Sequence, residues 1–299
     1  MLRVSCRDVA CNLCQSKETR HLYTINSYNV VKCNRCGLVY LNPMPCPADI
    51  SIIYDTQDYY CNRSSSSDSS TGYPDYIMLS DHLAFVADEL MRPLRDRDKG
   101  RLLDVGCGMG IMLKHLRERG WDTWGIDIST YATEYARNQL GMNVYTGAVE
   151  KTELPQNYFD VVTMVLTIEH VPDPATTLEA IKQLLKHGGI IIVATHDIDG
   201  LVPRLVKQKW RHFDIPEHLY YFSRDTLKKM LEKVGLVPFK YTETTSLGAV
   251  TGSNSGISTP TGLIRRYGLL AYIAPMMRGY HAIARKLNIS DGITVYARK

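Results

Sequence analysis

The sequence predicts an α/β protein in which a doubly wound parallel sheet follows a small metal-binding module. Three observations predict this order. Two C-x-x-C pairs stand near the N-terminus, a serine-rich run follows them, and from about residue 80 short apolar runs alternate with helical patterns. Strands that alternate with helices are typical of a parallel sheet covered on both faces.

Composition sets the limits of the prediction. The chain has 299 residues, 44% of them hydrophobic, with a net charge of +4 and 8 cysteines. It is long enough to bury a large core without disulfides, and its charge is too small to indicate a nucleic-acid partner. No signal peptide or apolar run of about 18 residues is present, so we expect a cytoplasmic protein without a transmembrane segment.

The first module, residues 1–61, contains four cysteines at the spacing of a structural zinc site. Eighteen residues separate the two pairs, within the C-x2-C-x15-20-C-x2-C pattern. Four thiolates leave no open position on Zn²⁺, so we expect a zinc-ribbon-like domain in which the metal does no chemistry. A redox pair is the minor alternative. The expected ligands are Cys11, Cys14, Cys33 and Cys36.

Residues 62–79 form the predicted boundary, because the run from Arg63 to Gly72 has the composition of a flexible linker. Tyrosines cluster on both sides of it. The alternative is therefore a lid that places aromatic rings over a substrate, and its tyrosines would be Tyr54, Tyr59, Tyr60, Tyr73 and Tyr76.

Residues 80–299 form the predicted main domain. Helical patterns cover Ser80 to Leu94, Ile111 to Arg119 and Thr176 to Leu185. The predicted strands are Arg101 to Val105, Trp121 to Ile126, Val144 to Thr146, Asp160 to Thr167, Ile190 to Thr195 and Asp291 to Arg298.

A glycine-rich loop follows the first of these strands. Gly106, Gly108 and Gly110 form G-x-G-x-G, with Asp104 two residues ahead. A dinucleotide fingerprint needs glycine at the place of Ile111, and no G-K-[ST] of a P-loop follows. The loop suits a ligand that approaches the backbone closely and carries no phosphate.

From about Leu83 to Lys299 the chain resembles the class I S-adenosylmethionine-dependent methyltransferases. The resemblance rests on this loop, on Asp127 after the next strand, and on the blocks Tyr158-Phe-Asp-Val-Val-Thr and Ile168-Glu-His-Val-Pro-Asp-Pro. It implies a Rossmann-like seven-stranded sheet with an antiparallel last strand, and S-adenosyl-L-methionine as cofactor. The implied cofactor-binding residues are Asp104, Gly106, Cys107, Gly108, Gly110, Asp127, Ile128, Ala148 and Val149.

The N-terminal module is similar to the zinc-binding domain fused to a subset of these methyltransferases, which includes sugar C-methyltransferases. The similarity implies that the segment Ile215-Pro-Glu-His lies near the methyl acceptor. Histidine is the usual general base for a protonated nucleophile. We therefore expect His218 as the base and Glu217 as the residue that orients it, with a cofactor-side or structural role for His170; His196 is a weaker candidate base.

A basic insertion is predicted at about 258–290, since no acidic residue stands between Glu243 and Asp291. We expect it to cap the site; peripheral membrane contact through about 263–287, or binding of an anionic acceptor, is the alternative.

The predicted function is methylation of a small molecule or glycan precursor, sugar-linked or anionic, on O, N or C. One alternative is an RNA base methyltransferase, although Thr163-Met-Val-Leu replaces its N-P-P-Y or D-P-P-Y signature. The other is a non-catalytic cofactor-binding subunit.

Overall fold

The computed structural model describes residues 5–61, 76–243 and 292–299. Of the predicted linker, only Tyr76–Leu79 is described, and it forms a 3-10 helix. The serine run, Tyr73 and the basic insertion at 258–290, with its 263–287 segment, lie outside the described residues.

A seven-stranded sheet forms the centre of the main domain, with the strand order β12-β13-β10-β9-β6-β7-β8. Its strands are β6 (Arg101–Val105), β7 (Asp122–Asp127), β8 (Asn143–Thr146), β9 (Phe159–Val165), β10 (Leu185–His196), β12 (Val237–Glu243) and β13 (Gly292–Arg298). The strand β13 pairs antiparallel with both β10 and β12, whereas β10, β9, β6, β7 and β8 are parallel neighbours. The expected Rossmann-like sheet with its antiparallel last strand is confirmed.

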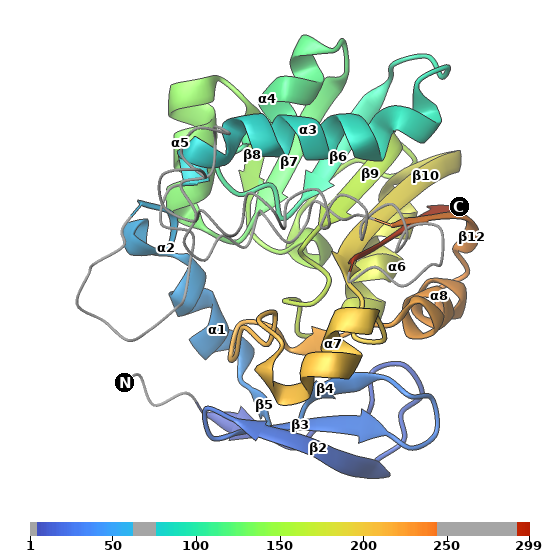
Figure 1. The fold of residues 1–299 in the computed structure, drawn as a ribbon. Coiled ribbons are helices and arrows are strands. Elements are labelled where there is room, and N and C mark those ends of the chain that lie inside the picture. Colours follow the sequence, from blue (N-terminus) through green and yellow to red (C-terminus); the bar gives the residue numbers. More distant parts are fainter. Residues whose placement is uncertain (1–4, 62–75, 244–291) are drawn as a thin grey trace, which may run out of the picture.

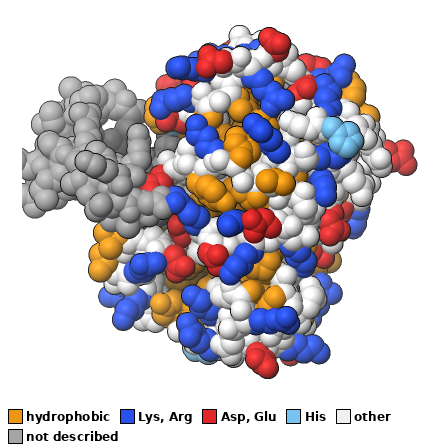
Figure 2. Space-filling model, turned by 90° about the vertical axis from the view of Figure 1, so that its right-hand side faces the viewer, with side chains coloured by type: hydrophobic (Ala, Val, Ile, Leu, Met, Phe, Trp, Pro, Cys, Tyr) orange, Lys and Arg blue, Asp and Glu red, His pale blue; other side chains and the backbone are white. Residues whose placement is uncertain are grey.

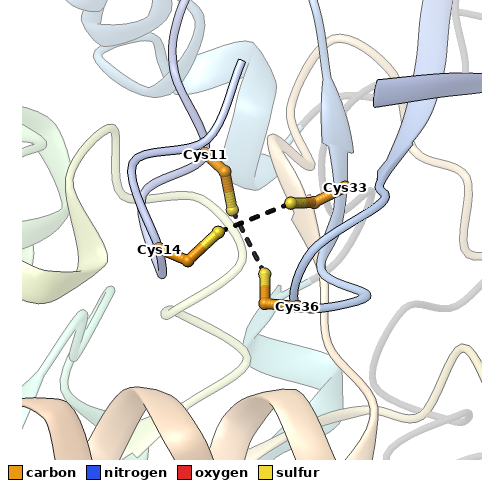
Figure 3. Close-up of side chains that lie close together, drawn as sticks. All are labelled: Cys11, Cys14, Cys33 and Cys36. Atoms are coloured by element: carbon orange, nitrogen blue, oxygen red, sulfur yellow. Dashed lines mark hydrogen bonds between the residues drawn. The ribbon is translucent and has the colours of Figure 1, made fainter. Parts of the chain in front are cut away.

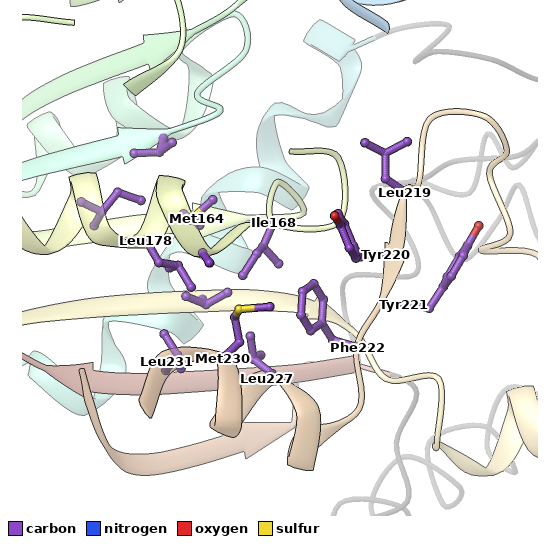
Figure 4. Packing of buried hydrophobic residues seen from close by; sticks show 14 of the residues in the cluster. Met164, Ile168, Leu178, Leu219, Tyr220, Tyr221, Phe222, Leu227, Met230 and Leu231 are labelled. Atoms are coloured by element: carbon purple, nitrogen blue, oxygen red, sulfur yellow. The ribbon is translucent and has the colours of Figure 1, made fainter. Parts of the chain in front are cut away.

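Helices cover both faces of this sheet (Figure 1). They are α3 (Ser80–Met91), α4 (Ile111–Glu118), α5 (Thr130–Leu140), α6 (Pro174–Leu184) and α8 (Arg224–Lys233). The short helix α7 (Leu201–Val206) lies beside the N-terminal module instead. Helices α3 and α4 bury Leu83 and Leu113 in one hydrophobic core. On the other face, α6 and α8 bury Leu178 and Leu227 in a second core, which also contains Met164 of β9 (Figure 4). Apolar stripes on amphipathic helices thus enclose strands that are buried on both faces.

Capping side chains begin several helices at defined residues. Ser129 accepts a hydrogen bond from the backbone N–H of Ala132 at the start of α5. Asp173 caps α6 ahead of Pro174, and Ser223 forms a capping box with Thr226 at α8. Such caps satisfy backbone N–H groups that have no partner within the helix. In the described ranges, no helix is long and apolar enough to cross a membrane.

The N-terminal module contains the short strands β1 (Cys6–Arg7) and β5 (Met44–Pro45), which pair with each other. A second sheet contains β2 (Thr19–Ile25), β3 (Tyr28–Cys33) and β4 (Val39–Leu41). Its fourth strand, β11 (Tyr220–Tyr221), comes from the main domain and pairs antiparallel with β4. The module and the main domain therefore share one sheet.

Two helices, α1 (Pro47–Tyr54) and α2 (Gln57–Cys61), leave the N-terminal module and rise toward the carboxyl ends of the central strands (Figure 1). The hydrophobic core is also continuous across this boundary. Tyr40 and Leu41 of β4 belong to the same buried cluster as Leu219 and Phe222. The module lies against the edge of the sheet at which the glycine loop is placed.

Candidate active site

The glycine loop lies between β6 and α4. Gly106 has φ +79°, and a Cβ atom there would overlap the side chain of Thr167 from the loop after β9. Gly110 has φ +75° and immediately precedes α4. Only glycine combines this backbone conformation with so close an approach, so the loop leaves space at the carboxyl edge of the sheet.

One buried aspartate, Asp104, and one half-buried aspartate, Asp127, hold this region in place. Asp127 accepts hydrogen bonds from the backbone N–H groups of Gly108 at 2.8 Å and Ser129 at 2.9 Å. Burial raises the pKa of Asp127, and these two donors oppose that rise. Burial also raises the pKa of Asp104 to about 7, against a hydrogen bond of 2.6 Å from the Thr163 hydroxyl. The aspartates thus tie the loop to the ends of adjacent strands.

A cavity of about 740 Å³ opens above the loop. Eight of the nine residues expected to bind the cofactor line it: Asp104, Gly106, Cys107, Gly108, Asp127, Ile128, Ala148 and Val149. Gly110 is not on the wall, because it forms the N-cap of α4. The sequence blocks are therefore brought together around a single space.

Tyrosines form much of the opposite wall of this cavity. Tyr54, Tyr59 and Tyr60 reach it from the α1–α2 segment, and Tyr76 reaches it from the start of the main domain. Their rings contact one another in series, with centroids 5.1 Å apart for Tyr54 and Tyr59 and 5.0 Å apart for Tyr59 and Tyr60. Four of the five tyrosines that the lid alternative names thus line one cavity.

The three expected catalytic residues lie together, but only one reaches the cavity. His170 lines the wall, whereas Glu217 and His218 do not. The rings of His170 and His218 are in edge contact, with centroids 4.6 Å apart. His218 is only 4% exposed and lies behind His170 as seen from the cavity.

The expected role of Glu217 is corrected by its contacts. Its carboxylate accepts a hydrogen bond of 3.2 Å from the hydroxyl of Tyr59. His218 is instead oriented by the backbone, because its Nδ1 lies 2.9 Å from the carbonyl oxygen of His212. The sequence could not show this, since adjacent side chains of an irregular segment point in directions that the fold decides.

Burial strongly affects the titration of these groups. It raises the pKa of Glu217 to about 8, with Asp214 as a further cause. It lowers the pKa of His170 well below the usual value for histidine, and the neighbouring His218 lowers it further. A deeply buried group favours its neutral form. Its surroundings therefore favour the neutral imidazole at His170.

His196, the weaker candidate, lies outside the cavity wall. It ends β10, and its ring stacks on His212 with centroids 3.6 Å apart. Its Nε2 is buried without a hydrogen-bond partner. Three histidines thus gather behind His170, which is on the cavity wall: His196, His212 and His218.

The four cysteines of the N-terminal module point toward one another (Figure 3). Cys11 and Cys36 have sulfurs 3.4 Å apart, and those of Cys14 and Cys33 are 3.5 Å apart. A disulfide would need about 2.05 Å, so all four are free thiols. Burial tends to raise the pKa of Cys33, but the backbone N–H groups of Cys36 and Arg35 outweigh it and lower that pKa to about 7.

The first cysteine knuckle is attached to the main domain through Asn12. The Asn12 side chain donates to Asp173 at 2.8 Å and accepts from the backbone N–H of Ala175 at 3.1 Å. The backbone carbonyl oxygen of Asn12 accepts from Nζ of Lys233 at 2.6 Å. Farther along, the carboxylate of Asp55 accepts from the backbone N–H of Thr130 at 2.8 Å. Neither residue could be identified from the sequence, since an Asn inside a knuckle and an Asp after a helix carry no local signal.

One face of the protein bears on the choice of partner. On the side shown in Figure 2, lysine and arginine side chains are interspersed with aspartates and glutamates and with small apolar patches. Among the described residues visible on this face, the basic side chains form no continuous stripe of the kind that follows a phosphate backbone.

The fold and the cavity define a cofactor-binding enzyme of the doubly wound α/β class. More narrowly, residues 74–240 match the family model described as a methyltransferase domain, and the chain belongs to that family. It is an S-adenosylmethionine-dependent methyltransferase.

Curated relatives include the ubiquinone biosynthesis O-methyltransferase of Nitrosomonas europaea, 36% identical over 115 residues, which are 36% of this chain and 47% of that protein. The enzyme of the same name from Bordetella avium is 30% identical over 176 residues, or 52% of this chain and 71% of that protein. The chain spans less than half the length of the first three such relatives.

Among solved structures, phosphoethanolamine N-methyltransferase 2 of Haemonchus contortus in complex with S-adenosyl-L-methionine superposes with a TM-score of 0.54 at 16% identity. The match covers 87% of this chain and 62% of that chain. At this identity the likeness concerns the fold alone.

Proposed function

We propose that this chain transfers a methyl group from S-adenosylmethionine to a hydroxyl group of a small molecule. The observation that carries the proposal is the division of one cavity into two walls. Asp127 and the glycine loop form the wall suited to the cofactor, and Tyr54, Tyr59, Tyr60 and His170 form the other. The relatives named as O-methyltransferases support oxygen as the acceptor atom.

The cofactor, when bound, supplies a methyl group already activated on a sulfonium. The protein then has to position the acceptor and exclude water, and a hydroxyl must also lose its proton. The tyrosine wall offers flat apolar surfaces for an acceptor with a planar ring. His170 is the imidazole on that wall, so we place the acceptor hydroxyl beside it.

We also propose that Asp127 binds the ribose of the cofactor. Its carboxylate is held by two backbone donors and retains further acceptor capacity for a diol. The Asp127→Asn variant should weaken cofactor binding at least about tenfold, which is typical for hydrogen bonds to a charged group. Calorimetry checks this, with the exposed Asp98→Asn as the matched control.

The acceptor atom is identified by mass spectrometry of products from labelled S-adenosylmethionine. The panel should contain hydroxylated aromatic compounds, matched compounds with an amine in place of the hydroxyl, and hydroxylated sugars. We expect methylation of the aromatic hydroxyl. Methylation of the amine alone, or of the sugar alone, would contradict the proposal.

We further infer that the four cysteines bind one structural zinc ion. Their sulfurs are slightly closer than the roughly 3.8 Å that a tetrahedral ion with bonds of about 2.3 Å requires. The four cysteines sit on two knuckles of the 5–61 module, which would make zinc part of its fold. The RNA base alternative receives no support from the mixed charge of the face in Figure 2.

A further inference from the structure

The N-terminal module also contacts the start of α5, next to the cofactor wall of the cavity. Asp55 stands between α1 and α2, and its carboxylate accepts hydrogen bonds from the backbone N–H groups of Thr130 at 2.8 Å and Tyr131 at 3.3 Å. These are the first two residues of α5. The first N–H groups of a helix have no partner within it, and a carboxylate beside them also interacts favourably with the helix dipole.

The cap of α5 is therefore divided between the two parts of the chain. Ser129, the N-cap residue, accepts a hydrogen bond of 3.2 Å from the backbone N–H of Ala132. The N–H groups of Thr130 and Tyr131 are bonded by Asp55. Of the first three N–H groups of this helix, the main domain thus binds one and the N-terminal module binds two.

The turn that leads into α5 carries part of the cofactor wall. Asp127 and Ile128 line the cavity, whereas Asp55 does not. The backbone N–H of Ser129 donates to the carboxylate of Asp127 at 2.9 Å. Asp127 thus holds the turn from the strand side and Asp55 holds it from the helix side, so the position of the Asp127 carboxylate depends on both.

A contact between two aromatic rings keeps α2 beside α5 (Figure 1). The ring of Tyr60 stacks on that of Tyr131, with centroids 6.0 Å apart and planes inclined by 28°. Tyr60 is only 4% exposed, whereas Asp55 is exposed and its hydrogen bonds compete with water. Substitution of Asp55 should therefore remove the cap of α5 and leave the α2 segment in place.

We propose that Asp55 of the N-terminal module is a positioning residue for cofactor binding, because it fixes the turn from Asp127 to Thr130 at the cavity wall. Its effect passes through the Asp127 carboxylate and not through contact with the cofactor. A binding group that is fixed in advance loses less conformational freedom when the ligand binds, so loss of this cap should weaken the affinity. The inference rests on the proposed role of Asp127 at the ribose and is independent of the methyl acceptor.

Calorimetry of S-adenosylmethionine binding to the full chain tests the proposal. Asp55→Ala should weaken binding at least about threefold, since alanine cannot cap a helix. Asp55→Asn should stay within about twofold of the parent, since asparagine keeps an acceptor oxygen and caps a helix as well as aspartate does. Asn12→Ala is the matched control, because it removes a contact of the same module with the start of α6, and it should bind as the parent does.

A double-mutant cycle distinguishes positioning from a general loss of structure. In the Asp127→Asn chain, the further substitution Asp55→Ala should weaken binding by a smaller factor than it does in the parent, because the carboxylate that Asp55 positions is no longer there. The thermal midpoint shows that each variant is folded.

Four results would overturn the role of Asp55 and leave the proposed function intact. They are an unchanged affinity in Asp55→Ala, a loss in Asp55→Asn as large as that in Asp55→Ala, an equal loss in Asn12→Ala, and full additivity in the cycle. An Asp127→Asn variant that binds as the parent does would overturn both this role and the proposed contact with the ribose. Methylation of amines alone would contradict the proposed acceptor and leave the role of Asp55.

Discussion

The hydroxyl of Tyr54 lies 2.8 Å from Nδ1 of His170 and 3.3 Å from the carbonyl oxygen of Glu217. Tyr54 ends α1 of the N-terminal module, and His170 follows β9 of the main domain. The imidazole on the cavity wall is thus positioned by a residue that is more than a hundred positions away in the chain.

We predict that Tyr54→Phe lowers kcat about fivefold and leaves the affinity for S-adenosylmethionine unchanged. The substitution removes the contacts of the hydroxyl with Nδ1 of His170 and with the Glu217 carbonyl oxygen. The hydrogen bond to His170, worth about 1 kcal/mol, positions a group that we place beside the acceptor and not beside the cofactor. Steady-state kinetics and calorimetry check the two quantities. Tyr145→Phe is a control of the same chemistry, since that ring stacks on Trp124 away from the cavity wall. An equal loss in both variants would contradict the role of Tyr54.

Loss of zinc should destabilise the whole chain and not the N-terminal module alone. We predict that Cys33→Ser lowers the free energy of unfolding by about 3 kcal/mol or more, because the structural ion is lost with its ligand. For a chain of this size that corresponds to a fall in the thermal midpoint of about 6 °C or more. The half-buried Cys46→Ser, outside the four-cysteine group, should stay within a degree or two of the parent.

The central sheet was predictable because its strands are buried on both faces and therefore appear as short apolar runs. The strand β6 was predicted at its observed bounds, and Asp127 was placed correctly at a strand end. The strand β11 was not predictable, since two residues, Tyr220 and Tyr221, carry no periodicity and their partner β4 lies far away in the sequence. The same reason applies to the contact between Tyr54 and His170.

At the candidate site, the directions of the side chains could not be predicted from the sequence. The sequence indicated Glu217, His218 and His170 as neighbours, and the structure brings them together. The sequence could not indicate that His170 reaches the cavity while His218 lies behind it. The positions of these two side chains follow from how their two loops pack against each other. The burial of Glu169, which is 2% exposed, is likewise a property of the packed structure alone.

The hydrogen bonds of the Asn12 side chain with Asp173 and Ala175 should stabilise the packing of the first cysteine knuckle against α6. Asn12→Ala removes two hydrogen bonds at the start of that helix and should lower the free energy of unfolding by about 1–2 kcal/mol. Asn34→Ala is the matched control, because Asn34 occupies the same place in the second knuckle but is exposed. Urea unfolding measures both. Equal free energies of unfolding of the two variants would mean that the Asn12 side chain does not stabilise the contact between the knuckle and α6.

An ion pair between α3 and the end of α4 should make the free energy of unfolding depend on pH in the acid range. Arg119 donates to Asp88 at 2.5 and 2.7 Å, and His115 lies 3.0 Å from the same carboxylate. The hydrogen bonds from Arg119, opposed by partial burial and assisted by His115, lower the pKa of Asp88 to about 2. Its value in the unfolded chain is about 3.9.

Because the folded pKa is the lower one, the stabilising contribution of Asp88 is complete above about pH 4 and is lost as the pH falls toward about 2. The side chain is 43% exposed, so solvent screening limits the contribution to about 1 kcal/mol or less. The free energy of unfolding of Asp88→Asn should therefore lie below that of the parent at pH 6, and the difference should shrink between pH 4 and pH 3. A difference that stays constant over this range would show that Asp88 acts through packing and not through its charge.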